Sequence, residues 1–288
     1  MIYILLNITS STLIILIFNL SQRFKVEIFP IVIINYYIAA SIGLAYWHNE
    51  LPPTSTLIHK PWIPMAIVVG ILFVVMFFVI GRATRQVGVS ITTVSAKMSV
   101  VFPILFSLLY YHENLSTNKI LGIPLAILAV LLLTYKPKTL ALDTRYWYVP
   151  IILFAGAGLV DTLVKYIQGS HPEVADGGIF SGTLFLISAS FGTLIAIARR
   201  SPIRSFLSLP TLLSGTLLGI VNFGSLYFLM QALSQPSIDS SIVFGLVNIG
   251  TVLASVAIAL LVLHEKLHTI NWLGVGLSLL AIVLLSNP

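Results

Sequence analysis

Two stretches decide the fold: HENLSTNKILG at residues 112–122 and HEKLHTINWLG at residues 264–274. Both begin with a His-Glu pair, have a leucine two residues after the glutamate, and end in Leu-Gly, at a constant offset of 152 residues. The match continues at the same offset, where Ala129 corresponds to Ala281. Because self-similarity at a fixed offset indicates an internal repeat, we expect two structural copies, residues 1–140 and residues 141–288.

The composition around these stretches excludes a water-soluble globule. Of the 288 residues, 58% are hydrophobic and 8% are charged, and the mean hydropathy is +1.03. That leaves too little polar surface to cover a folded body in water, so lipid is the expected solvent. The net charge of +6 is better explained by basic loops than by nucleic acid. The chain has no cysteine, which excludes disulfides and thiol chemistry.

A bilayer core of roughly 30 Å needs about 20 apolar residues per helix, and the chain offers ten such runs. They are apolar all round, unlike the alternating strands of a membrane barrel, so we expect helices. The expected spans are 2–20, 28–47, 62–84, 89–110, 118–135, 146–168, 178–199, 209–232, 237–262 and 270–286.

Ten spans in two copies give five helices per copy. Because five is odd, the second copy has the opposite orientation in the membrane. This inverted repeat is the plan of many secondary transporters. The segments that follow even-numbered spans carry two Lys or Arg residues, and the segments that follow odd-numbered spans carry eleven. Since positive loops stay cytoplasmic, the charges predict that both termini face away from the cytoplasm. We expect a multi-pass protein of the cell membrane, the inner membrane if the source is Gram-negative.

These features resemble the EamA-like branch of the drug/metabolite transporter superfamily, over nearly the whole chain. The repeat motif that carries the resemblance is Pro103, Glu113 and Gly122 in the first half, and Glu265 and Gly274 in the second. The resemblance implies ten helices, alternating access and export of amino acids or other small metabolites. It also implies cytoplasmic termini, against the loop charges.

Charged residues inside the spans are the first candidates for a site, because burying a charge costs about 2.5 to 3.5 kcal/mol on insertion scales. Lys97 lies well inside the fourth span and shares a helical face with Ser90 and Thr93. We predict that this face lines a transport path. The alternative is a lysine that reaches back to the loop, or one bonded to a carbonyl of a broken helix.

Asp161 and Lys165 in the sixth span are four residues apart, which lets them pair on one face. Either the pair is structural, or Asp161 exchanges a proton or binds substrate.

Further polar and aromatic residues are weaker candidates for substrate contact: Asn222, Asn248, Tyr36 and Tyr227. Their alternative role is packing between helices. Gly215 and Gly219 form a GxxxG pattern that suits internal packing as well as dimerisation, so the expected state is a monomer or weak dimer.

Glu113 and Glu265 occur at the same place in both repeats, at helix ends where the dipole disfavours a carboxylate. We expect a structural bond at the turn, such as capping the next helix, with Ser116 or Thr117 as the cap residue in the first repeat. HEKLH at 264–268 matches a zinc-protease pattern, but it falls at a helix end, so we predict no metal.

No nucleotide-binding or hydrolase motif is present in the sequence, so we expect no enzyme activity and no cofactor. The prediction is a secondary transporter, an exporter of amino acids or organic anions, with lipid and a small-molecule substrate as partners. Two alternatives remain: a translocase of a phosphate-bearing lipid-linked carrier, and a membrane scaffold without cargo.

Overall fold

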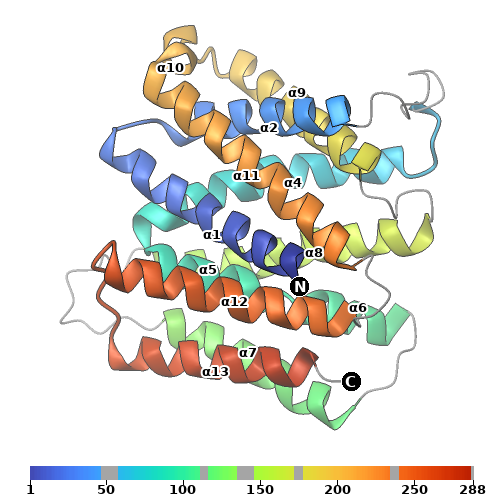
Figure 1. Ribbon diagram of the computed structural model, residues 1–288, viewed down its shortest axis with the longest axis vertical. Helices are drawn as coiled ribbons and strands as arrows, with labels where there is room; N and C mark the ends of the chain where they lie inside the picture. The colour runs from blue at the N-terminus through green and yellow to red at the C-terminus, as the bar shows by residue number, and fades with distance from the viewer. Residues whose placement is uncertain (47–57, 111–115, 135–145, 172–177, 234–239, 287–288) are drawn as a thin grey trace.

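The computed structural model describes residues 1–46, 58–110, 116–134, 146–171, 178–233 and 240–286, and over these ranges every regular element is a helix (Figure 1). The helices are α1 (Ile2–Arg23), α2 (Ile28–Tyr46), α4 (Ile63–Gln86), α5 (Val89–Met98), α6 (Val101–Tyr110), α7 (Thr117–Thr134), α8 (Val149–Ser170), α9 (Gly178–Ala198), α10 (Ile203–Leu207), α11 (Leu209–Leu233), α12 (Ser240–Leu261) and α13 (Thr269–Ser286).

Seven segments are long and apolar enough to cross a membrane, and three more helices are apolar but shorter. Large apolar side chains such as Leu194, Ile197 and Leu217 are exposed, while Asn7, Thr93 and other polar residues are buried. A surface of this kind is stable only against lipid. The chain is therefore an all-α, multi-pass membrane protein, as its composition predicts.

Each of the ten expected spans coincides with helix in the structure, with ends that differ by a few residues. Two features were not predicted. The short helix α10 precedes α11, and the expected span 89–110 is divided at Ser99 and Val100 into α5 and α6.

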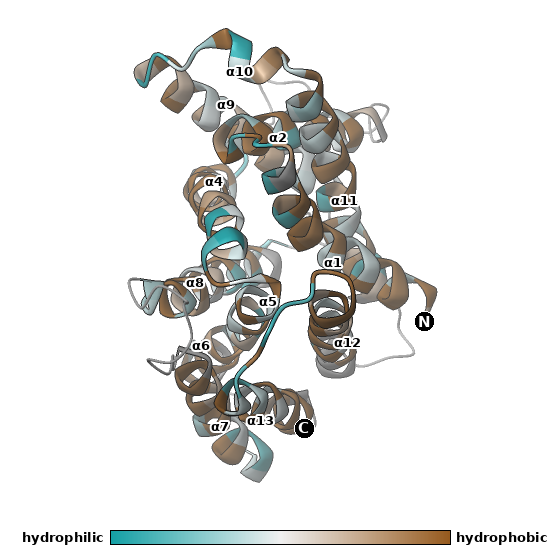
Figure 2. Cartoon of the chain, turned by 90° about the vertical axis from the view of Figure 1, so that its left-hand side faces the viewer, coloured by the Kyte–Doolittle hydropathy of each residue, from teal (hydrophilic) through white to brown (hydrophobic). Residues whose placement is uncertain are grey.

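The helices run across the body and are stacked from one end to the other (Figure 1). α7 and α13 pack along each other at one end, and α9, α10, α2 and α11 gather at the other. Between them lie α1, α4, α5, α8 and α12, seen nearly end-on in Figure 2. α5, from the first half of the sequence, contacts α8 and α12, which both come from the second half.

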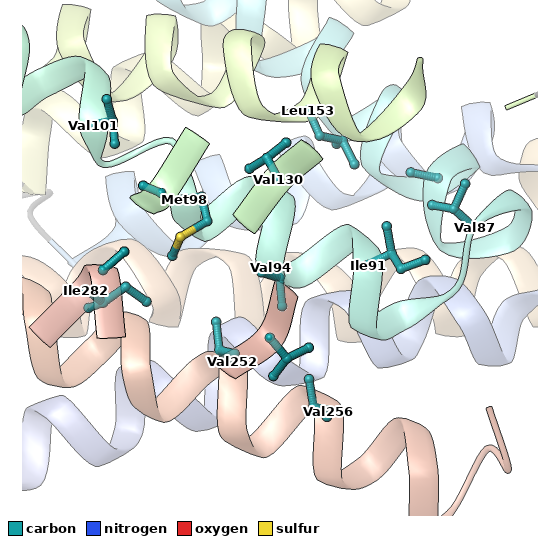
Figure 3. Close-up of a cluster of buried hydrophobic side chains, with 14 of the residues drawn as sticks. Val87, Ile91, Val94, Met98, Val101, Val130, Leu153, Val252, Val256 and Ile282 are labelled. Atoms are coloured by element: carbon teal, nitrogen blue, oxygen red, sulfur yellow. The ribbon is translucent and has the colours of Figure 1, made fainter. Parts of the chain in front are cut away.

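The largest apolar cluster surrounds α5 (Figure 3). Ile91, Val94 and Met98 recur at intervals of three and four residues, which places them on one face of α5. Val252 and Val256 of α12 pack against that face. The apolar face of α5 is thus covered, and its polar residues lie on other faces.

The GxxxG pattern in α11 serves packing within the chain. A Cβ added at Gly219 would lie 2.6 Å from Cβ of Ile38 and 2.7 Å from the carbonyl oxygen of Asn35, both on α2. One at Gly215 would lie 2.7 Å from Cβ of Ile34. The two glycines therefore let α11 and α2 approach closely.

We expect Gly219→Ala to destabilise the protein by about 1–3 kcal/mol, because the added methyl meets a backbone carbonyl that cannot move aside. The measurement is thermal unfolding in detergent. Gly276→Ala on α13 is the matched control, since nothing lies within 4 Å of the added Cβ there. Equal melting temperatures for the two variants would contradict the close packing of α11 on α2.

Candidate functional site

The interruption between α5 and α6 is the structural feature on which the candidate site rests. Pro103 has no N–H to donate to the carbonyl of Ser99, and a proline ring clashes with the carbonyl four residues earlier. The helix accordingly ends at Met98, and Phe102 N donates to the Ser99 carbonyl instead, at 2.9 Å. The interruption leaves the carboxyl end of α5 and the amino end of α6 in the interior of the span.

α8 lies against this interruption because Gly158 has no side chain. A Cβ added at Gly158 would overlap Phe102, the second residue of α6. One turn further along α8, Asp161 accepts a hydrogen bond from the Ser99 hydroxyl at 3.0 Å. The glycine thus brings a carboxylate in the middle of α8 to the point where α5 ends.

Lys97 supplies the opposite charge. It lies two residues before Ser99, and the charges of Lys97 and Asp161 interact electrostatically. Lys97 is half-buried and Asp161 is exposed. The Lys97 ammonium carries three N–H donors.

Sequence spacing does not indicate the pairing of Asp161 with Lys97, since the two residues belong to different helices. The prediction that Lys165 pairs with Asp161 stays a prediction; Lys165 is half-buried on α8, one turn beyond Asp161. The clue that sequence reasoning missed is the combination of Ser99 with Pro103, which marks a helix break beside Lys97.

Glu265 forms the second polar centre. Its carboxylate accepts hydrogen bonds from Val89 N at 2.6 Å, from Ser90 N at 3.2 Å and from the Ser90 hydroxyl at 3.1 Å. These groups form the first turn of α5, where N–H groups lack partners inside the helix and the dipole favours an anion. Glu265 therefore caps a helix of the other half of the chain.

The predicted cap of the following helix is wrong for Glu265. At the start of α13, which follows it, Nδ1 of His268 accepts from Ile270 N at 3.5 Å, and the Asn271 side-chain oxygen accepts from His268 N at 3.2 Å. In the first half, the Ser116 hydroxyl accepts from Lys119 N at 3.3 Å, so Ser116 is the predicted cap there. Glu113 lies outside the described residues.

On the predicted transport face of α5, two of the three side chains are buried and hydrogen-bonded within the protein. Ser90 is fully buried and held by Glu265, and the Thr93 hydroxyl is buried and donates to the Val89 carbonyl at 2.9 Å. Of the three residues on that face, Lys97 is the one that is not fully buried.

Tyr36 lies in the packed interior, and its predicted contact with substrate stays a prediction. It is fully buried, donates to the Phe73 carbonyl at 2.7 Å, and packs against Phe77 and Phe185. Tyr227 stacks on Phe223, with ring centroids 5.7 Å apart. Both tyrosines therefore contribute to packing.

The two asparagines are buried on different helices, Asn222 on α11 and Asn248 on α12. The side-chain nitrogen of Asn222 has no hydrogen-bond partner in the structure. For Gly122, an added Cβ would lie 2.8 Å from Leu285, so this residue makes the contact of α7 with α13; Gly274 is buried on α13.

In the described ranges, no three histidine or acidic side chains gather at one place. The chemistry that the site offers is recognition of charge, by a cation and an anion in the interior of the spans.

Comparison with known proteins shows the fold and leaves the function open. No protein-family model matches the sequence. An uncharacterized protein of Haemophilus influenzae is 28% identical over 221 residues, which are 76% of this chain and 74% of that protein. A crystal structure of a protein that is 16% identical aligns over 96% of both chains with a TM-score of 0.57.

We expect Glu265→Gln to lower the stability by about 1–2 kcal/mol, because the variant loses the negative charge at the start of α5. Thermal unfolding in detergent measures the effect. Lys266→Gln is the control, since it removes the exposed charge next to Glu265. If both variants have the same melting temperature, the bond of Glu265 to α5 does not stabilise the protein.

Proposed function

We propose that this protein is a secondary transporter of small metabolites that works by alternating access, with ten spans in two inverted five-helix repeats of the EamA type. Its substrate carries a carboxylate, as amino acids and organic acids do, and the resemblance of the sequence favours export. Neither the uncharacterized relative nor the structural neighbour bears on this choice.

The packing of α7 against α13 supports inversion of the repeats. Gly122 lies at Leu285, and the Asn271 side chain donates to the Leu132 carbonyl at 3.3 Å. The start of each helix thus meets the end of the other, so the two run antiparallel. Because α7 and α13 correspond through the repeat, their antiparallel course is what an inverted pair requires.

Other helix–helix contacts also occur in corresponding pairs when the two repeats are interchanged. If the repeats correspond, α1, α2, α4 and α5 match α8, α9, α11 and α12. The contact of α2 with α11 then matches that of α9 with α4, and the contact of α1 with α12 matches that of α8 with α5; all four pairs are in contact. Such exchange is expected of two copies related by a two-fold axis.

The observation that carries the proposal is the pair of charges at the interrupted span. Interrupted helices in the middle of a membrane are typical of substrate sites in secondary transporters. Charges at this depth are costly, and they usually face a ligand pathway. Lys97 binds the substrate carboxylate, and alternation of the two repeats exposes it to each side in turn.

The test is flux into liposomes that contain the purified protein, measured with labelled amino acids and labelled mono- and dicarboxylic acids in separate assays. We expect uptake above empty liposomes for at least one of these carboxylates. Lys97→Met should reduce that flux about tenfold or more, because a charge-assisted hydrogen bond contributes about 1.5–3 kcal/mol.

Lys25→Met is the control, because Lys25 is an exposed lysine in the turn after α1. It should leave the flux unchanged. Absence of flux for every carboxylate tested would overturn the proposal, and so would equal flux in the two lysine variants.

A further inference from the structure

We propose that Lys97 is shared between Asp161 and the substrate, so that binding of an organic acid releases Asp161 to take up a proton. The protein would then carry one proton together with each carboxylate. This inference rests on the proposed transport function, and it adds the coupling ion and the residue that binds it.

The hydroxyl of Ser99 is placed for both states of Asp161. Its oxygen lies 2.6 Å from the Ala96 carbonyl oxygen and 3.0 Å from Oδ2 of Asp161. While Asp161 is ionised, both neighbours are acceptors, and the single hydroxyl hydrogen cannot serve both fully. Once Asp161 is protonated, it donates to Ser99, and Ser99 donates to Ala96. The protonated form therefore completes the hydrogen bonds of the interruption.

Lys97 is the charge that acts on Asp161. The helices packed against α8 are α4, α5, α6 and α7. Their other charged or titratable side chains, with those of α8 near Asp161, are Arg82, Arg85, Tyr110, Lys119, Lys165 and Tyr166. Arg85 donates to Ser21 and Val26, and Tyr110 packs on Tyr166. Lys97 interacts electrostatically with Asp161, so neutralising Lys97 weakens the stabilisation of the carboxylate.

Neither Asp161 nor Lys97 is fully enclosed by protein. Asp161 is exposed although it lies in the middle of α8, and Lys97 is half-buried. The exchange that we propose therefore needs no unfolding of α5 or α8.

The charges balance through the exchange. In the unloaded protein, the Asp161 carboxylate neutralises the Lys97 ammonium. A monocarboxylate that binds Lys97 takes over this role, and Asp161 binds one proton, so the loaded site is again neutral. For a monocarboxylate, the step moves one proton and one anion together and no net charge. A pH gradient should therefore drive the flux, and the membrane potential should not.

The exchange can be tested without a substrate, because Lys97→Met removes the ammonium directly. We expect this variant at neutral pH to show the infrared carbonyl absorption of one additional protonated carboxylic acid relative to the unmodified protein. The absorption should be lost in Lys97→Met combined with Asp161→Asn. Identical carbonyl absorption in the single and the double variant would overturn the proposal.

Two further lysine variants keep this test independent of folding. Lys97→Arg retains a cation at the site and should show no additional carboxylic acid. Lys165→Met removes the neighbouring lysine of α8, and it should also leave Asp161 ionised. If Lys165→Met produces the acid absorption and Lys97→Met does not, Lys165 is the partner of Asp161 and the shared-lysine proposal is wrong.

The flux arm uses the same liposomes with a labelled monocarboxylate that the protein carries. An acidic exterior should accelerate uptake in the unmodified protein, and a membrane potential at equal pH should not. In Asp161→Asn, the pH gradient should lose its effect. Carboxylate flux that ignores the pH gradient would overturn proton coupling while leaving the transport function standing. Absence of any flux would instead overturn the transport function, and the infrared result would still decide the exchange.

Discussion

The structure depends on the rule that backbone polar groups inside a membrane must find partners within the protein or in a water-filled space. Unbroken helices meet this rule by themselves. The interruption at Ser99 does not, because Pro103 cannot donate to the Ser99 carbonyl. Here the Phe102 N–H and the Ser99 hydroxyl supply local bonds, and Asp161 approaches from α8. Asp161 is therefore brought to the helix break by the hydrogen bond that it accepts from Ser99.

The two ends of α5 tie this interruption to the rest of the molecule. Glu265, from the second half of the sequence, caps the first turn of α5, while Asp161 meets its last turn through Ser99. About 12 Å of continuous helix separates Val89 from Lys97, at 1.5 Å per residue. The cap and the charged site therefore lie at opposite ends of one helix.

Most of the helices could be predicted from the sequence, because a long apolar run in lipid has no alternative to helix. The span of α9, Gly178–Ala198, shows this. Its residues form one continuous, mainly apolar run, and the predicted ends differ little from the observed ones. The division of α5 from α6 was missed because hydropathy does not change across Ser99. The local clue, a proline four residues after a serine, concerns hydrogen bonding and not polarity.

The site was predictable in its residues but not in its pairings. Lys97 and Asp161 attract attention individually because each is a charge in an apolar run. A spacing of four residues suggests Lys165 as the partner of Asp161, whereas the electrostatic interaction with Lys97 depends on how closely α8 approaches at Gly158. The difference changes the chemistry: an isolated ammonium simply attracts anions, but an ammonium beside an accessible carboxylate must exchange one anion for another. The released carboxylate then needs a new cation, and in a water-poor interior a proton is the smallest one that can reach it.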